Sequence, residues 1–328
     1  MTDPSELYAA LEEEVGTLIV GLEDQVGLLT IAVLTRGHIL LEGVPGVAKT
    51  SLANVFATAT GLDYNRIQMT PDILPADITG TKIYREEAGQ FDIQYGPIFS
   101  NLVVADEINR ATPKTQSALL EAMEENQVTI EGDTYPLAEV FMIIATQNPI
   151  EMEGIFELPE AQRDRFQMKV SVDLPSREDE LTLVDRFDDD PTLVPEDIEQ
   201  VVDRDDIQTA REVVADIHID EDIEEYIVDI VGATREHPDL AHGASPRATL
   251  AFLNTAKARA AIFGRDYVIP DDVKAMAEPI LAHRLIMSTE AELGEVDRSD
   301  IVADVLESVV PPGGGEEESV ETEPVEQE

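Results

Sequence analysis

The stretch EGVPGVAKTS, residues 42–51, decides how the rest of the chain is interpreted. It approaches the phosphate-binding pattern G-x-x-x-x-G-K-[ST], with Gly43, Lys49 and Thr50 at the required spacing. The apolar run HILLEG (38–43) precedes it, and the helix-forming run SLANVFATAT (51–60) follows it. A strand, a glycine turn and a helix N-terminus together aim backbone N–H groups at an anion. The stretch therefore predicts a site for the phosphates of a nucleotide.

One position of the loop departs from the pattern, because Ala48 stands where a glycine is expected before the lysine. We expect Ala48 to begin the helix with a right-handed backbone, where a methyl group removes no N–H donor. Lys49 is expected to reach the β and γ phosphates of ATP, and Thr50 to hold Mg²⁺ through its hydroxyl group. The alternative is a glycine turn that only starts a helix. The residues expected to surround the phosphates are Gly43, Val44, Pro45, Gly46, Val47, Ala48, Lys49, Thr50 and Ser51.

Length and composition exclude several classes of protein. A chain of 328 residues, 43% of them hydrophobic, can form about two domains with cores of their own. The absence of cysteine excludes disulfides and thiolate metal sites. No run is long and apolar enough to cross a membrane, and the N-terminus does not resemble a signal peptide, so we expect a cytoplasmic protein.

The net charge is −47, from 69 acidic and 22 basic residues. Such a chain is either an acidic domain that repels nucleic acid or a protein adapted to very high salt, where repulsion between carboxylates is screened. The acidic residues are spread over the whole chain, which favours a halophilic protein, as from a haloarchaeon. No basic patch is interleaved with aromatic residues, so we expect no direct binding to nucleic acid.

Strands and helices alternate in the first half of the chain. Short apolar runs predict buried strands, and amphipathic or capped segments between them predict helices. The predicted strands lie at 38–43, 101–107, 140–149 and 167–175, and the predicted helices at 50–60, 113–126 and 158–166. This alternation predicts a parallel α/β sheet with helices on both faces. The run QVTIEGDTYPL (127–137) predicts a hairpin that turns at Gly132 and Asp133.

The pattern changes after Pro175. Residues 176–310 contain helical periodicity and no convincing strand, and residues 311–328 are rich in glycine, proline and glutamate. We therefore expect an α/β nucleotide-binding core at 1–175, an all-helical lid domain at 176–310 and a disordered acidic tail at 311–328.

Three polar residues follow two of the predicted strands. Asp106 and Glu107 end the run NLVVADE, and Asn148 ends the run VFMIIATQN. Ligands bind outside the carboxyl ends of strands in such sheets, so these residues are expected near the loop. Asp106 would complete the Mg²⁺ shell, Glu107 would polarise the attacking water, and Asn148 would orient that water or contact the γ-phosphate. Taken alone, an exposed strand end or an Asn-Pro turn would explain them.

Arginines are the candidates for stabilising charge on the transferred phosphoryl group. Arg163 and Arg165 lie on the short predicted helix and are expected to act on the nucleotide of a neighbouring subunit, Arg165 being the stronger candidate. Arg247, in GASPRA (243–248), opens a helix of the second domain and could couple it to the nucleotide. Surface arginines are the alternative in each case. The histidines, His38, His218, His237, His242 and His283, have no metal-ligand spacing.

Together these motifs resemble those of AAA+ ATPases, and more narrowly of the MoxR family within the helix-2-insert clade. The resemblance spans about residues 15–290. The pieces that carry it are GVPGVAKT, VVADEINRA (103–111), ALLEAMEE (118–125), IIATQNPIEMEGIFELPEAQRDRF (143–166) and GASPRA. MoxR loops are similar in having alanine at the position of Ala48, so the loop resembles a family variant of a working site.

The resemblance also implies roles for individual residues. Lys49 and Thr50 match the Walker A residues, Asp106 and Glu107 the Walker B pair. Asn148 matches sensor 1, Arg165 the arginine finger and Arg247 sensor 2. These three residues and Glu107 would be the catalytic residues. Val20 and Gly21 resemble the segment beside the adenine, and residues 80–97 the hairpin of the helix-2 insert, which projects toward the ring pore. Arg163 departs from the family, which usually has leucine there, and this leaves the finger assignment open.

What the family implies is a homo-oligomeric ring, expected to be a hexamer, that hydrolyses ATP with Mg²⁺ between subunits. It would act as a chaperone-like remodeller of proteins with von Willebrand factor A domains, in their maturation or cofactor insertion. One alternative is a chelatase motor subunit or a DNA-associated motor. The acidic character of YREEAGQFD and VTIEGDTY counts against the DNA motor. The other alternative is a scaffold that binds nucleotide without hydrolysis, although Glu107, Asn148 and Arg165 are all present.

Overall fold

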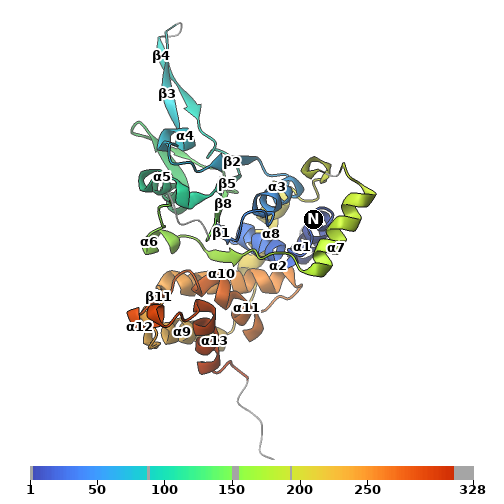
Figure 1. Ribbon diagram of the computed structural model, residues 1–328, viewed down its shortest axis with the longest axis vertical. Coiled ribbons are helices and arrows are strands. Elements are labelled where there is room, and N and C mark those ends of the chain that lie inside the picture. The colour runs from blue at the N-terminus through green and yellow to red at the C-terminus, as the bar shows by residue number, and fades with distance from the viewer. Residues whose placement is uncertain (1–2, 87–88, 150–154, 193, 314–328) are drawn as a thin grey trace, which may run out of the picture.

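The computed structural model describes residues 3–86, 89–149, 155–192 and 194–313. Its centre is a five-stranded sheet with the strand order β2-β5-β8-β1-β9 (Figure 1). All neighbouring strands pair in parallel. The predicted parallel α/β sheet is therefore confirmed. The strands are β1 (Ile39–Glu42), β2 (Tyr64–Gln68), β5 (Leu102–Asp106), β8 (Met142–Gln147) and β9 (Met168–Ser171).

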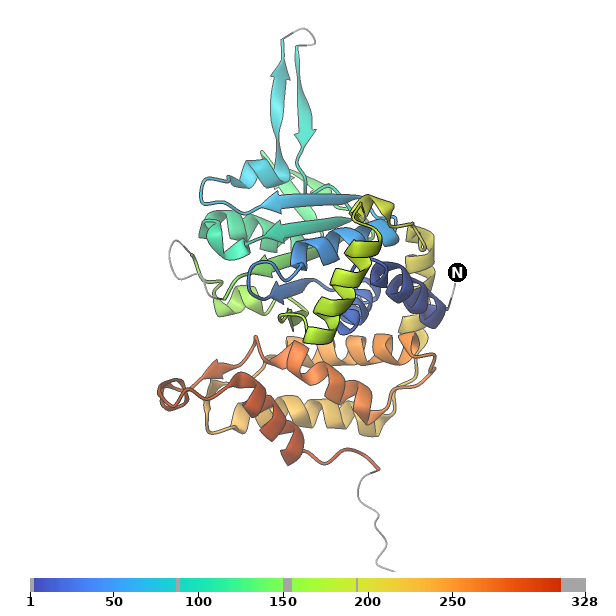
Figure 2. The ribbon, with the colours of Figure 1, turned by 45° about the vertical axis from the view of Figure 1, so that its right-hand side comes forward.

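Both faces of the sheet are buried, which is why the strands read as continuous apolar runs. Alternate residues enter two separate hydrophobic clusters: Val104 and Ile144 belong to one, and Val103 and Ile143 to the other. Helices α1 (Pro4–Gly16), α2 (Glu23–Leu34) and α3 (Lys49–Ala59) contribute to the first cluster. Helix α5 (Pro113–Glu125) contributes to the second. The sheet therefore lies between two helical layers (Figure 2).

Strand β2 was not among the predicted strands. Its sequence YNRIQ is polar, and only Ile67 is buried. It lies at the edge of the sheet, where it pairs with β5 through backbone hydrogen bonds. An edge strand needs little apolar surface, so the hydrophobic pattern gave no signal.

Two hairpins extend the core. Strands β3 (Gly80–Arg85) and β4 (Gln90–Tyr95) follow the short helix α4 (Pro75–Thr79) and project far from the sheet (Figure 1). Strands β6 (Gln127–Ile130) and β7 (Asp133–Pro136) form the hairpin expected over 127–137. Its turn was predicted one residue too late. The turn residues are Glu131 and Gly132, both with positive φ, as a two-residue hairpin loop requires.

The described residues beyond β9 are mainly helical, but the expectation of an all-helical domain is wrong in one place. Strands β10 (Leu240–His242) and β11 (Ile286–Met287) form a short antiparallel pair. Helix α8 (Arg204–Asp216) packs on α1, α2 and α10 (Pro246–Ile262), so the helical part and the α/β part share one hydrophobic cluster. The other elements are η1 (Ile108–Arg110), α6 (Glu160–Arg163), α7 (Arg177–Asp189), η2 (Pro195–Asp197), α8 (Arg204–Asp216), α9 (Glu221–Glu236), α10 (Pro246–Ile262), α11 (Pro270–Leu281), α12 (Thr289–Leu293) and α13 (Arg298–Ser308).

Two further expectations concern the C-terminal tail and the crossing of a membrane. The tail expected at 311–328 falls, beyond residue 313, outside the described residues. Within the described part, no helix combines the length and the apolar character needed to cross a bilayer.

Candidate active site

The phosphate-binding loop joins β1 to α3 at the carboxyl edge of the sheet. Lys49 opens α3, and its Nζ donates hydrogen bonds to the carbonyl oxygens of Gly43 at 2.6 Å and Val44 at 2.8 Å. These oxygens stand where phosphate oxygens would compete for the ammonium group. Burial lowers the pKa of Lys49, while Asp106 and Glu107 oppose that shift. The lysine thus spans the concave side of the loop, as a phosphate ligand must.

Glycine is required at the first position of the loop. A Cβ atom on Gly43 would lie 2.2 Å from the carbonyl oxygen of Val172, which follows β9. Gly46 has a φ of +88° and nothing within 4 Å of an added Cβ, so its requirement is conformational. The two glycines therefore serve different purposes, close packing against the sheet and a left-handed turn.

The expected conformation of Ala48 is wrong. Ala48 has φ +61° and ψ +17°, a left-handed conformation, and α3 begins only at Lys49. The conformation brings its Cβ close to the neighbouring carbonyl oxygen, which costs about 1–2 kcal/mol in a residue other than glycine. Strain of this kind is typical of functional loops. A glycine at position 48, as the pattern expects, would therefore relieve strain.

We expect Ala48→Gly to stabilise the protein by up to about 1 kcal/mol, because relief of the left-handed strain exceeds the extra entropy that glycine loses on folding. Unfolding in denaturant measures the change. The matched control is Ala53→Gly, in the interior of α3, which should destabilise the protein by about 1 kcal/mol or more. An Ala48→Gly variant that loses as much stability as the control would contradict the assigned backbone conformation.

Asp106 lies beside the loop at the carboxyl end of β5. Its Oδ1 accepts a hydrogen bond of 2.6 Å from the Thr146 hydroxyl group, and Thr50 Oγ1 is 3.4 Å from both of its carboxylate oxygens. Arg66 on β2 donates to Oδ2 through Nε at 3.1 Å and also through Nη2. The carboxylate and the Thr50 hydroxyl group thus converge on one point beside Lys49.

This donor set fits magnesium. Mg²⁺ favours hard oxygen ligands, and in nucleotide sites one or two protein groups hold it together with phosphates and water. Within the described ranges, no cluster of three or more His, Cys, Asp or Glu side chains would hold a metal alone. Thr50 and Asp106 therefore suit an ion that arrives with a nucleotide. When bound, such an ion would neutralise charge on the phosphates.

Glu107 follows Asp106 and turns the chain away from β5. It has a φ of +58°, the second strained residue of the site, and its backbone N–H donates to Thr146 Oγ1 at 2.9 Å. Its Oε2 accepts hydrogen bonds from Gln68 Nε2 and Arg110 Nη1, both at 2.9 Å. The Glu107 side chain is 27% exposed, so it is held in place while it remains accessible to water.

Sequence reasoning missed Arg66, Gln68 and Thr146. The two β2 residues are two positions apart, so they lie on the same face of the strand and reach Asp106 and Glu107 respectively. A recognised edge strand would have indicated them, because its polar residues alternate with Ile67. Thr146 was hidden inside an apolar run that it interrupts.

Asn148 and Val20 are the remaining residues expected near the loop. Asn148 is buried and follows β8, whose Gln147 carbonyl group accepts a hydrogen bond from Gly43 N at 3.2 Å. Val20 lines a cavity of about 100 Å³ beside the loop residues Gly46, Val47 and Ala48. This cavity is mostly apolar, and Leu18, Ile19, Leu22, Asp173, Pro175 and Leu183 complete its walls. It has the character of an adenine pocket.

The candidate arginines Arg165 and Arg247 lie together at a different place from the loop. Arg165 Nη2 is 3.0 Å from Glu124 Oε2, and Arg247 pairs with the other oxygen of the same carboxylate. Glu124 is near the end of α5, Arg165 follows α6 and Arg247 opens α10. Three segments far apart in sequence thus meet at one carboxylate. Neither arginine has a hydrogen bond or ion pair to a described residue of the phosphate-binding loop.

The segment that carries Arg165 is attached to the helical part of the chain. Asp164 Oδ1 accepts a hydrogen bond of 2.8 Å from Arg284 Nε, and its Oδ2 accepts one of 3.0 Å from the Ser245 hydroxyl group. Arg284 is buried and donates further bonds to the carbonyl oxygens of Phe166 and Gln167. Ser245 caps α10, so the positions of Arg165 and Arg247 are coupled through Asp164.

Comparison with known proteins identifies this arrangement. The family model for AAA, the ATPase family associated with various cellular activities, matches residues 38–168, and the AAA lid domain model matches residues 232–305. A solved structure of a candidate ATPase from Cytophaga hutchinsonii superimposes with a TM-score of 0.87 at 41% identity. The match covers 94% of this chain and 96% of that one.

Two relatives share most of their length with this chain. It is 43% identical to the uncharacterized protein YeaC of Bacillus subtilis, over 92% of this chain and 93% of the relative. It is 42% identical to Chaperone MoxR1 of Mycobacterium tuberculosis, over 91% of this chain and 81% of the relative. The matches extend well beyond the nucleotide loop. The chain therefore belongs to the MoxR family of AAA+ ATPases.

Proposed function

We propose that this protein hydrolyses ATP with Mg²⁺ at sites formed between neighbouring copies of the chain. The observation that carries the proposal is the division of the site. Lys49, Thr50 and Asp106 converge beside one another, whereas Arg165 and Arg247 are held together by Glu124. One chain therefore offers two complementary halves, and a second copy would supply the arginines that the first half lacks.

Each residue of the first half has a defined task in the proposed site. Lys49 binds the β and γ phosphates, Thr50 and Asp106 hold Mg²⁺, and backbone N–H groups of residues 43–51 surround the phosphates. Glu107 accepts a proton from the attacking water, and Asn148 orients that water. Val20 and Gly21 border the adenine. The cavity between Val20 and the loop supports this assignment, because it is mostly apolar and is also lined by Val47 and Ala48.

The second half acts on the nucleotide of the next copy. Arg165 stabilises the charge that develops on the γ-phosphoryl group, and Arg247 contributes from the lid domain. Their common bond to Glu124 supports a joint role, since a nucleotide phosphate would replace that carboxylate as the anion between them. Arg163 lies near His283. Burial and Arg284 lower the pKa of His283 most, and the charge of Arg163 adds to this effect. We therefore keep Arg165 as the finger.

The domain limits and the larger assembly are part of the same proposal. The core comprises residues 1–175, the lid domain 176–310 and the acidic tail 311–328. The assembly is a cytoplasmic ring, a hexamer in its simplest form, that remodels client proteins with von Willebrand factor A domains. The name of the Mycobacterium tuberculosis relative, Chaperone MoxR1, supports the chaperone-like part. The acidic surface, with a net charge of −47, supports a halophilic source.

The experiment that tests the function is steady-state ATP hydrolysis by the purified full-length protein in molar KCl, with and without Mg²⁺. High salt is chosen because it screens the excess negative charge. We expect hydrolysis that requires Mg²⁺ and that is lost in Lys49→Ala, since the alanine cannot hold the β and γ phosphates. Lys114→Ala, at an exposed position of α5 with no assigned role in the site, is the control. Equal turnover in Lys49→Ala and the wild type would contradict the proposed site.

A further inference from the structure

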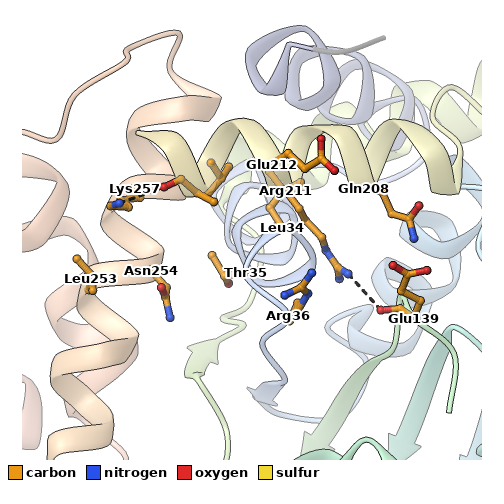
Figure 3. Close-up of a pocket in the computed structure, with 12 residues that line it drawn as sticks. Leu34, Thr35, Arg36, Glu139, Gln208, Arg211, Glu212, Leu253, Asn254 and Lys257 are labelled. Carbon is orange, nitrogen blue, oxygen red and sulfur yellow. Dashed lines mark hydrogen bonds between the residues drawn. The ribbon is translucent and has the colours of Figure 1, made fainter. Parts of the chain in front are cut away.

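A groove runs along the amino edge of the sheet, opposite the phosphate-binding loop. It consists of two cavities of about 470 and 340 Å³ that share Thr35, Arg36 and Asn254. Arg36 precedes β1 and Glu139 precedes β8, while α8 and α10 form the other walls (Figure 3). The smaller cavity also contains Arg165 and Arg247. We call these two continuous cavities the amino-edge groove.

The amino-edge groove concentrates positive charge in a chain that has little of it. Arg36, Arg211 and Lys257 line the larger cavity, and none of them forms an ion pair with another described residue. Arg211 is buried and donates hydrogen bonds to the carbonyl oxygens of Val33 and Glu139. Burial and the nearby Arg36 lower its pKa to about 10. Figure 3 shows the two guanidinium groups close together on the groove wall.

Acidic and apolar groups temper this charge without removing it. Glu139 and Glu212 line the larger cavity and Glu124 and Asp164 the smaller one. Apolar surface of the larger cavity comes from Leu34, Val214 and Leu253. Leu250, one turn beyond Arg247 on α10, is 60% exposed and belongs to the smaller cavity. The groove thus fits an occupant that presents apolar side chains among carboxylates.

Helix α7 presents such a surface. Its sequence REDELTLVDRFDD is dominated by carboxylates, and no described residue of the helix is buried. Leu181, Val184 and Phe187 are spaced three residues apart and are 46%, 64% and 43% exposed. A helix that carries exposed apolar residues at this spacing has a face without a partner in its own chain.

An adjoining face of α7 holds the helix beside the nucleotide loop. Leu183 and Pro175 line the cavity that contains Val47 and Ala48. Arg186 Nη1 donates to the carbonyl oxygens of Gly16 at 2.7 Å and Thr17 at 2.5 Å. The exposed apolar face therefore borders the half-site that binds the phosphates, on the side of the molecule away from α6 (Figure 1).

We propose that the acidic, apolar face of α7 docks into the amino-edge groove of the neighbouring copy of this chain. The inference rests on the proposed function, because Arg165 and Arg247 of one copy must then face the loop of the next. The groove lies beside those arginines, and α7 lies beside that loop. The groove of one copy must therefore meet α7 of the next. The two surfaces are opposite in charge and both offer apolar contact, as expected of interfaces that use charge to select their partner.

The absence of cysteine makes a direct test possible, since introduced thiols are the only ones present. Val184→Cys on α7 and Asn254→Cys in the groove are made separately in the Glu107→Gln background. The two proteins are mixed with ATP and Mg²⁺ and treated with a short bismaleimide. We expect covalent dimers in the mixture and at least about tenfold fewer with either variant alone. Val228→Cys, on the exposed face of α9, replaces Val184→Cys as the control and should give no dimers above background.

Three cross-linking results would overturn the docking. They are equal cross-linking by Val228→Cys, equal cross-linking of Val184→Cys to itself, and no cross-linking in assemblies whose mass shows that copies have associated. A protein that stays monomeric with ATP would overturn it as well. Hydrolysis of ATP by the wild-type protein separates the two proposals. Hydrolysis without the α7 cross-link refutes the docking alone, whereas a wild-type protein that does not hydrolyse ATP refutes the proposed function.

An independent variant tests the charge of the groove. Arg36→Glu should weaken association by about tenfold, because it places a carboxylate opposite the carboxylates of α7. Sedimentation measures the association over a range of protein concentrations. Lys114→Glu changes the charge by the same amount on α5, outside both cavities, and should leave association unchanged. Equal effects of the two variants would mean that net charge, and not the groove, controls assembly.

Discussion

Glu107→Gln is expected to lower the rate of ATP hydrolysis by about 10²–10⁴-fold, the usual contribution of a positioned general base. The amide has the shape of the carboxylate but cannot accept a proton from water. It can still occupy the place between Gln68 and Arg110, so the surrounding structure should be preserved. Steady-state turnover of ATP measures the effect, and ATP binding, measured by equilibrium dialysis, should stay within about twofold of the wild type.

The separation of binding from turnover distinguishes this role from a structural one. Glu107 has a left-handed backbone and anchors two side chains, so a structural residue would affect folding and ATP binding together. The matched control is Glu225→Gln on the exposed surface of α9, which should leave both quantities unchanged. Hydrolysis by Glu107→Gln at the wild-type rate would rule out Glu107 as the base.

The parts of the site that lie near one another in sequence were predictable, because their spacing reflects local backbone geometry. The loop, its strand and its helix are contiguous, and Asp106 and Glu107 end a strand whose burial on both faces gives a continuous apolar run. Parallel pairing of β1, β8 and β5 then brings the carboxyl ends of the strands together. For these residues the pattern determines the position.

The residues that were not predicted depend on packing between distant segments. Arg66 and Gln68 lie on an edge strand with one buried side chain, so no periodicity marks them. The left-handed backbone of Ala48 is imposed by the turn between β1 and α3, whereas alanine by itself favours helix. The strands β10 and β11 span three and two residues, too few for a period to be visible.

The meeting of Arg165 and Arg247 is the most consequential feature that sequence could not reveal. Each motif predicts a cation, but neither indicates that both would bind Glu124. That contact depends on how α10 lies against α5, which is fixed in part by Ser245 and Arg284 on either side of Asp164. The structure therefore groups the lid arginine with the finger, and this grouping underlies the prediction that both act on the next copy.

Arg165→Ala is expected to lower ATP turnover by about 10³–10⁵-fold, the range known for arginines that stabilise the transferred phosphoryl group. ATP affinity should change little, because the phosphate-binding loop of the same chain is intact. Arg163→Ala is the matched control: its side chain lies toward His283, and its loss should have a much smaller effect. Turnover and ATP binding are measured for both variants. A larger loss in Arg163→Ala would exchange the roles of the two arginines.

Mixing variants decides whether Arg165 acts on the next copy. Arg165→Ala has an intact loop and Lys49→Ala has an intact arginine, so a mixed assembly contains interfaces that combine both intact halves. Turnover should therefore rise above that of either variant alone. A mixture of Lys49→Ala with Glu107→Gln should stay inactive, because both substitutions damage the loop half and no interface is complete. Equal recovery in the two mixtures, or none in assemblies known to contain both variants, would exclude a shared site and leave each chain to hydrolyse ATP with its own residues.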